Sequence, residues 1–290
     1  MSVQRITSWD GRTVEACRSR RSGVWYFVDW EHNLLPLGDG LAWPESLRRQ
    51  VRAYVARPSW FATADAAVLA AKLGRISKFQ SVNAEDPVTW SWFGTLALAD
   101  PQTQRNALQW LYDTLGFDVE ASADVRIDQW PRVVHPNAPG SPNGPEIDAR
   151  IDDAGSALLY VEAKWDAGLG SGKGAEEGAH DDQVVLRRDS LRADPGLADD
   201  DRLFVVLGVS SEIPDLAVYD EPSDTSKRPV RISWISWDDL AGCDAHPLAA
   251  EFRRYIAWKR SSPTLDPELT GPQSVTQGFP CCPVSGRRRV

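Results

Sequence analysis

The sequence lacks the features of a membrane-embedded or secreted protein. No apolar run in its 290 residues approaches the roughly 20 residues that a bilayer span needs. No basic-then-apolar signal peptide follows Met1, so we expect a cytoplasmic protein with no membrane partner. The four cysteines, at positions 17, 243, 281 and 282, have no framework spacing, which favours reduced thiols over disulfides.

The chain also lacks an excess of positive charge: it has 32 Lys and Arg against 41 Asp and Glu, which gives a net charge of −9. This argues at first against nucleic acid, because phosphate binding depends on Lys and Arg. The charges are unevenly distributed, however: residues 1–80 hold 12 basic and 7 acidic groups, and residues 81–210 hold 10 basic and 23 acidic. A basic flank suits a polyanion partner, and an acidic middle suits metal binding or carboxylate chemistry. Two solvated surfaces with no partner are the alternative.

The hydrophobic content of 42% and charged content of 25% are ordinary for a globular protein, which excludes wholesale disorder. We expect three regions: a basic N-terminal accessory lobe of α+β type over residues 1–80, a core over 81–260, and a disordered tail over 261–290 that is rich in Pro, Gly, Ser and Thr. Within the lobe, the residue patterns predict strands over 13–19 and 23–30 and helices over about 43–56 and 63–73.

The core alternates between helical and strand patterns, which indicates an α/β fold. A continuous apolar run at 203–209 predicts a strand that is buried on both faces, and the glycine-rich segment 166–178 predicts a flexible loop. The patterns predict helices over 85–98, 102–115, 181–192 and 247–259, and strands over 146–153, 157–165, 203–209 and 230–237, with a weaker strand pattern within 117–130.

The strands at 146–153 and 157–165 are separated by Ala-Gly-Ser, which suits a tight hairpin. If the turn centres on Gly155, Asp148 lies opposite Glu162 and Glu146 lies opposite Lys164. Because strand side chains alternate between the two faces, Asp148, Glu162 and Lys164 are expected to share one face.

Two directly opposed carboxylates repel each other, and a divalent cation between them removes that cost. Hard oxygen ligands of this kind suit Mg²⁺, which keeps several waters and leaves coordination sites for a substrate phosphate. Lys164 would lie beside the metal, where it could orient or deprotonate a water or neutralise developing charge. The alternative is an exposed charged strand face with a Glu146–Lys164 pair.

These residues resemble the signature of the PD-(D/E)xK nuclease superfamily, an acid on one strand and (D/E)-x-K on the next. The matching text is GPEID at 144–148 and YVEAKW at 160–165. One departure is that Ile147, and not a proline, precedes the first acid, with Pro145 two residues earlier. The resemblance implies that Asp148 and Glu162 bind Mg²⁺, for which Mn²⁺ can substitute, and that the backbone carbonyl of Ala163 is a further ligand. By the same resemblance, Lys164 assists the attacking water.

Two flanking elements also resemble the superfamily. Many members carry a Glu on the helix before the hairpin, and Glu85 is the candidate for this metal-site residue; the alternative is a carboxylate that interacts with the helix dipole. Many members follow E-x-K with a helix bearing Gln and then Arg or Tyr. Gln183 and Arg187 are four residues apart and share a helix face, which implies catalytic or substrate contacts. A solvated surface amide is the alternative for Gln183.

The resemblance implies a restriction-endonuclease-like fold, a mixed β-sheet flanked by helices with the N-terminal α+β lobe attached. It also implies a Mg²⁺-dependent nuclease that hydrolyses phosphodiester bonds, with DNA as the favoured nucleic acid, in restriction or antiphage defence. Paired cuts would favour a homodimer. One alternative is a catalytically silent nucleic-acid or protein-binding module on the same fold. Another is a carboxylate-pair hydrolase such as a glycosidase, in which Lys164 has no role.

Overall fold

The computed structural model describes residues 3–18, 24–28, 30–35, 81–137, 144–165, 183–194, 202–211 and 229–261. The chain divides into two compact units, the first formed by residues 1–88 and 254–290 and the second by residues 89–253. Four predicted features lie outside the described residues: the helices at 43–56 and 63–73, the glycine-rich loop at 166–178, and the tail from residue 262 onward.

The first unit contains a three-stranded antiparallel sheet in the order β1-β2-β3. The two predicted strands are confirmed as β2 and β3, whereas β1 has no counterpart in the prediction because most of its side chains are exposed and its apolar residues do not alternate regularly. The elements are β1 (Val3–Thr7), β2 (Thr13–Arg18), β3 (Trp25–Phe27) and the 3-10 turn η1 (Trp30–Asn33).

The last turns of helix α7 (Ala249–Ser261) complete the small core of this unit. The Trp258 ring stacks on Phe27 with centroids 5.7 Å apart, and its indole N–H donates to Thr7 O at 3.0 Å. The ammonium of Lys259 donates to the carbonyl oxygens of Val82 and Ala84. The buried side chains of the cluster are Ile6, Val14, Ala16, Trp25, Phe27 and Val82.

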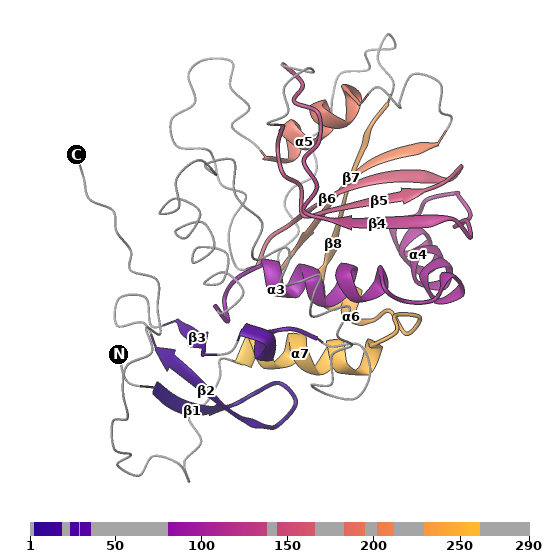
Figure 1. Cartoon of the computed structure of the whole chain (residues 1–290). Coiled ribbons are helices and arrows are strands. Elements are labelled where there is room, and N and C mark those ends of the chain that lie inside the picture. Colours follow the sequence, from indigo (N-terminus) through magenta and orange to yellow (C-terminus); the bar gives the residue numbers. More distant parts are fainter. Residues whose placement is uncertain are drawn as a thin grey trace, which may run out of the picture. The chain divides into compact units, whose positions relative to one another are not determined.

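The second unit is built on a five-stranded mixed sheet in the order β4-β5-β6-β7-β8 (Figure 1). Strands β4, β5 and β6 pair antiparallel, and β6, β7 and β8 pair parallel. The β7 side chains from Phe204 onward are all buried, which confirms the strand predicted from the apolar run. The strands are β4 (Val125–Gln129), β5 (Ala149–Asp153), β6 (Ala157–Ala163), β7 (Leu203–Ser210) and β8 (Arg231–Ser236).

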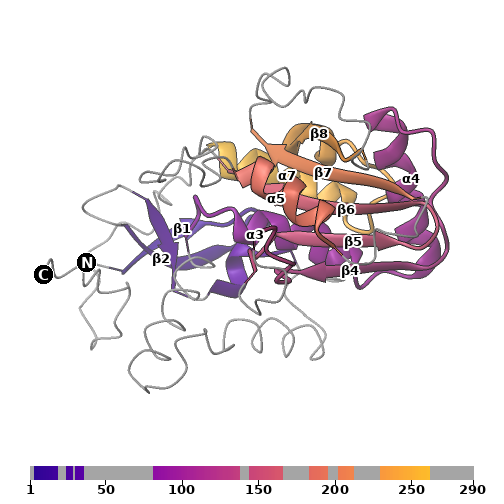
Figure 2. The ribbon, with the colours of Figure 1, turned by 90° about the horizontal axis from the view of Figure 1, so that it is seen from above.

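Helix α5 (Gln183–Arg192) covers one face of this sheet, above β6 and β7 (Figures 1 and 2). Its contact face is apolar, because Val184 and Leu191 are fully buried against the strands. The cluster beneath the helix contains Ile147, Leu158, Tyr160, Phe204, Val206 and Trp234.

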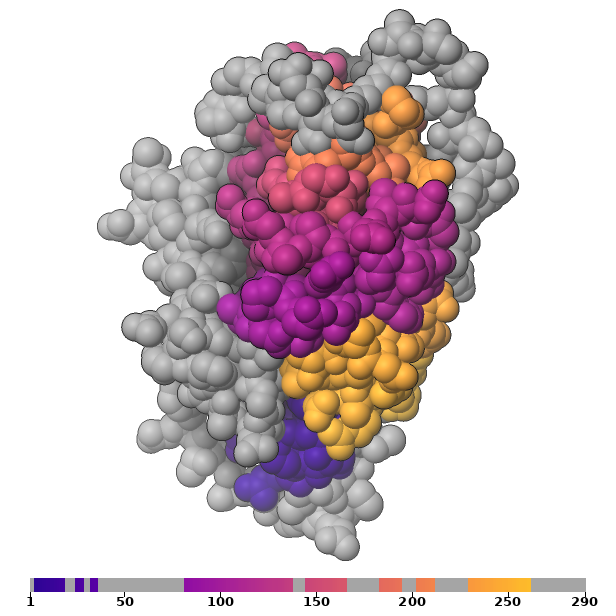
Figure 3. Space-filling view, turned by 90° about the vertical axis from the view of Figure 1, so that its right-hand side faces the viewer, coloured from indigo at the N-terminus to yellow at the C-terminus, as the bar shows by residue number. Residues whose placement is uncertain are grey.

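Helix α4 (Pro101–Leu115) lies on the opposite face of the sheet, where the phenol of Tyr112 donates to Asp153 at 2.8 Å (Figure 1). Its start and end follow the expected signals: Asp100 accepts from the N–H of Thr103, and Gly116 ends the helix with a φ of 67°. Part of α4 lies at the surface that Figure 3 shows. The other helices within the described ranges are α3 (Asp86–Thr89), the π-helical turn η2 (Trp90–Gly94) and α6 (Trp237–Ala241).

The predicted α/β class, a mixed sheet flanked by helices, is confirmed. The predicted hairpin register is confirmed over Ala149–Asp153, since Ala149 pairs with Val161 across a turn in which Gly155 has a φ of 82°. The predicted pairs of Asp148 with Glu162 and of Glu146 with Lys164 lie outside this pairing, and Glu146 forms an isolated bridge with Arg132. Helix α6 begins in a capping box formed by Ser236 and Asp239. Among the described residues, no helix is long and apolar enough to span a bilayer.

Candidate active site

Glu162 and Lys164 occupy alternate positions at the end of β6, on the side of the sheet that α5 covers. The Lys164 ammonium donates to Glu162 Oε1 at 2.7 Å, and the two residues are only 8% and 2% exposed. The alternative of an exposed charged face is therefore wrong for these residues. Lys164 forms its ion pair with Glu162, and Glu146 forms one with Arg132 at 3.8 Å.

Asp148 lies where the regular pairing of β5 and β6 ends. β5 begins at Ala149, and not at Glu146 as predicted, because the Asp148 side chain enters the ladder: its Oδ2 accepts from the Ala163 N–H at 2.7 Å. The alternation of faces breaks at the same point, since Ile147 packs in the cluster beneath α5. The predicted face of Ile147 is therefore wrong, and Asp148 lies beside the end of β6.

Two side chains, Asp148 and Lys164, hydrogen-bond to the backbone of Ala163. The N–H and C=O of one strand residue point toward the same neighbouring strand, so both groups of Ala163 face the β5 side. Asp148 accepts from the N–H, and the Lys164 ammonium donates to the C=O at 3.0 Å. The ammonium also holds Glu162, so the two carboxylates, the lysine and one carbonyl oxygen form a single connected cluster.

Arg187 joins the cluster from α5. Its Nε donates to Glu162 Oε2 at 2.9 Å, and the residue is 7% exposed. The two Glu162 oxygens are thus divided between Lys164 and Arg187. The spacing of Arg187 on its helix indicated this helix face, but the contact with Glu162 depends on how α5 packs. The predicted substrate contact of Arg187 stays a prediction.

Both backbone polar groups of Lys164 are hydrogen-bonded. Its N–H donates to Val209 O at 2.7 Å, and its C=O accepts from the indole N–H of Trp237 at 2.8 Å. Trp237 is fully buried at the start of α6. Sequence reasoning did not single it out for this role, because no local pattern links positions 164 and 237.

Gly208 lies beside Glu162 in the sheet and is paired with Trp234 on its other side. A Cβ atom on Gly208 would stand 2.4 Å from the Trp234 ring, so glycine lets this indole lie across β7. We expect Gly208→Ala to lower the free energy of unfolding by about 1–3 kcal/mol through overpacking, measured by urea denaturation.

The matched background for this prediction is Trp234→Leu, in which the clashing ring is absent. In that background, adding Gly208→Ala is expected to lower the free energy of unfolding much less, because the two positions are coupled through direct contact. An equal cost in both backgrounds would contradict the clash as its cause.

Two further predicted site residues, Glu85 and Gln183, lie on elements other than the hairpin. Glu85 immediately precedes α3 and is partly buried, and it belongs to the first unit, whereas Asp148, Glu162 and Lys164 belong to the second. Gln183 is the first residue of α5, and its side chain is exposed. The roles of Glu85 and Gln183 in the site stay predictions.

The donor chemistry of the cluster suits a hard cation. Asp148, Glu162 and the Ala163 carbonyl provide only oxygen atoms, and Mg²⁺ is usually bound by one or two carboxylates together with waters and substrate phosphates. Within the described residues, no group of three or more His, Cys, Asp or Glu side chains gathers as a ready-made cage. The residues therefore fit an open magnesium site better than a closed structural metal site.

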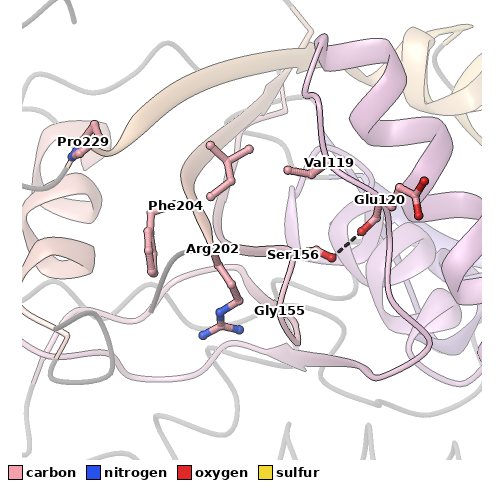
Figure 4. Close-up of a pocket in the computed structure, with 8 residues that line it drawn as sticks. Val119, Glu120, Gly155, Ser156, Arg202, Phe204 and Pro229 are labelled. Atoms are coloured by element: carbon pink, nitrogen blue, oxygen red, sulfur yellow. Dashed lines mark hydrogen bonds between the residues drawn. The ribbon is translucent and has the colours of Figure 1, made fainter. Parts of the chain in front are cut away.

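A cavity of about 580 Å³ opens at the other end of the hairpin, around its turn (Figure 4). There the Ser156 hydroxyl donates to the Glu120 carbonyl oxygen, and Arg202 forms an ion pair with Asp152. Its lining mixes apolar and polar groups without a cluster of nucleophilic or metal-binding side chains: Val119, Glu120, Gly155, Ser156, Arg202, Leu203, Phe204 and Pro229. This cavity therefore adds no candidate chemistry.

Comparisons with known proteins add no assignment. No protein-family model, no curated protein and no solved structure matches the chain.

Proposed function

We propose that this protein is a Mg²⁺-dependent nuclease with a restriction-endonuclease-like core, and that it hydrolyses phosphodiester bonds, with DNA as the favoured substrate. The observation that carries the proposal is that Asp148 and Lys164 both hydrogen-bond to the Ala163 backbone, and that Lys164 also holds Glu162. Their order along the hairpin is that of the PD-(D/E)xK signature. The mixed sheet, with α5 over one face and α4 over the other, is an architecture suited to such a core.

In the proposed reaction, Asp148, Glu162 and the Ala163 carbonyl would hold Mg²⁺. The bound ion supplies Lewis acidity, which makes a water more acidic and neutralises phosphate charge. Water oxygen attacks phosphorus, one P–O ester bond breaks with its electron pair on the leaving oxygen, and the water proton passes to solvent or to that oxygen. Lys164 would orient the water or stabilise the charge that develops on the phosphate oxygens.

One observation favours a second candidate, a catalytically silent binding module. Both Glu162 oxygens already have cationic partners, Lys164 and Arg187, so the cluster is balanced as an ion-pair network. A network of this kind can serve fold specificity alone. The two candidates differ in whether cleavage occurs and whether it needs a divalent ion.

The test is a cleavage assay on plasmid, linear and single-stranded substrates with Mg²⁺, Mn²⁺ or EDTA. We expect cleavage with either metal and none with EDTA. Asp148→Asn is expected to reduce the rate at least about a hundredfold, because the loss of one charged stabilising group commonly costs that much. Lys164→Ala is expected to abolish cleavage with the fold intact.

The matched control is Asp128→Asn on β4, a carboxylate that pairs with Arg126 at the surface. It removes the same charge from a neighbouring strand and should leave cleavage unchanged. Salt-sensitive nucleic-acid binding without cleavage by the wild-type protein would support the binding module instead. Cleavage that persists in EDTA would reject the metal-dependent mechanism.

A further inference from the structure

The Lys164 ammonium contacts the same two oxygen atoms that the proposed function assigns to the metal. It lies 2.7 Å from Glu162 Oε1 and 3.0 Å from Ala163 O. Both contacts are buried, with Lys164 8% and Glu162 2% exposed. In such a site, water screens charge poorly, so an ammonium and a divalent cation on the same oxygens would repel each other strongly.

We propose that Lys164 and the divalent cation compete for Glu162 Oε1 and Ala163 O. Lys164 must release these oxygens before the site can accept the cation, and its side chain therefore sets the metal affinity of the site. This inference rests on the proposed function and deepens it. The proposed function assigns Lys164 only to the hydrolytic step, and the inference adds that Lys164 also limits how tightly the metal binds.

Arg187 has a different role on the same carboxylate. It holds the other oxygen, Glu162 Oε2, at 2.9 Å, and it comes from a separate element, α5. Val184 and Leu191 anchor that helix on the sheet. Arg187 is thus a positioning residue, which keeps the Glu162 carboxylate oriented while Lys164 exchanges on Oε1.

The exchange would be a movement of the Lys164 side chain and not of its backbone. The backbone N–H is held by Val209 O and the backbone C=O by the Trp237 indole. The four-carbon stem of lysine is flexible and its ammonium can rotate to new acceptors. The released ammonium would therefore stay near the cluster, where a substrate phosphate would provide its next partner.

The experiment is isothermal titration of Mn²⁺ into the full chain, for wild type, Lys164→Met and Arg187→Gln. We expect Lys164→Met to bind Mn²⁺ at least on the order of tenfold more tightly than wild type, because the two hydrogen bonds of the ammonium no longer have to be broken. Arg187→Gln is the matched control: it removes the same positive charge from the same carboxylate but releases neither Oε1 nor Ala163 O. It should show no such gain.

Lys164→Gln is titrated alongside as a second variant, because it keeps a neutral donor at this position, and its affinity should fall between wild type and Lys164→Met. Circular dichroism in EDTA checks that each variant is folded. If wild type and both Lys164 variants bound Mn²⁺ with equal affinity, the proposed competition would be wrong, but the metal site itself would still be supported. An equal gain in Arg187→Gln would also overturn it, since simple charge removal would then explain the effect. No Mn²⁺ binding by any folded form would overturn the proposed function as well.

Discussion

Glu162→Gln is expected to lower the free energy of unfolding by about 3–5 kcal/mol, the range for removing one partner of a buried ion pair. The carboxylate is 2% exposed and accepts from both Lys164 and Arg187, which are themselves buried. A glutamine of nearly the same shape leaves both cations without their counter-charge. The measurement is urea unfolding in EDTA, so that metal binding does not contribute.

The control for this prediction is Glu146→Gln. Glu146 lies near the same hairpin, but its ion pair with Arg132 is longer, at 3.8 Å, and its side chain is 28% exposed. Glu146→Gln is expected to lower the free energy of unfolding by less than about 1 kcal/mol. Adding Lys164→Met to Glu162→Gln should restore part of the stability by removing one uncompensated cation. A cost for Glu162→Gln as small as that of the control would show that Glu162 is better solvated than its burial indicates.

Acidification is expected to remove about 3 kcal/mol of stability through His246 alone. Burial lowers the pKa of this imidazole to about 4 from its ordinary value of 6.5, and the hydrogen bond to Trp92 O opposes the shift only partly. The unfolded chain therefore binds a proton below pH 6.5 that the folded chain does not bind. Stability is fully present above pH 6.5, falls as the pH drops toward 4, and loses no more through this group below that value.

The surroundings of His246 explain why it resists protonation. Its ring stacks on Trp92 at 5.2 Å, and its Nδ1 accepts from the Leu248 N–H, so a proton on Nδ1 would break that bond. The second nitrogen contacts Thr95 Oγ1 and Trp92 O. Both ring nitrogens of His246 therefore already have hydrogen-bond partners in the folded protein.

The measurement for His246 is the free energy of unfolding between pH 8 and pH 4, compared with His246→Gln. The variant is expected to be less stable at pH 8 but to show a flatter pH dependence, because many carboxylates titrate in both proteins and only the histidine differs. Parallel curves for the two proteins would contradict a buried neutral His246.

The sequence alone was sufficient for the parts of the fold that depend on local rules. The Gly155 turn sets the hairpin register, because a tight turn leaves the two strands one way to pair. Asp100 and Gly116 bound α4 because each satisfies backbone groups at one helix end. The apolar run of β7 predicted its burial on both faces. Side-chain alternation correctly put Glu162 and Lys164 on one face.

Tertiary structure decided what those residues contact. Strict alternation failed at Ile147, next to the point where the Asp148 carboxylate takes the Ala163 N–H in place of a backbone acceptor. The division of Glu162 between Lys164 and Arg187 depends on the packing of α5, and the support of Lys164 by Trp237 joins residues 73 positions apart. Periodicity specifies which face a side chain occupies. Burial and the competition among hydrogen-bond donors and acceptors then select its partner, and these arise only when distant segments pack together.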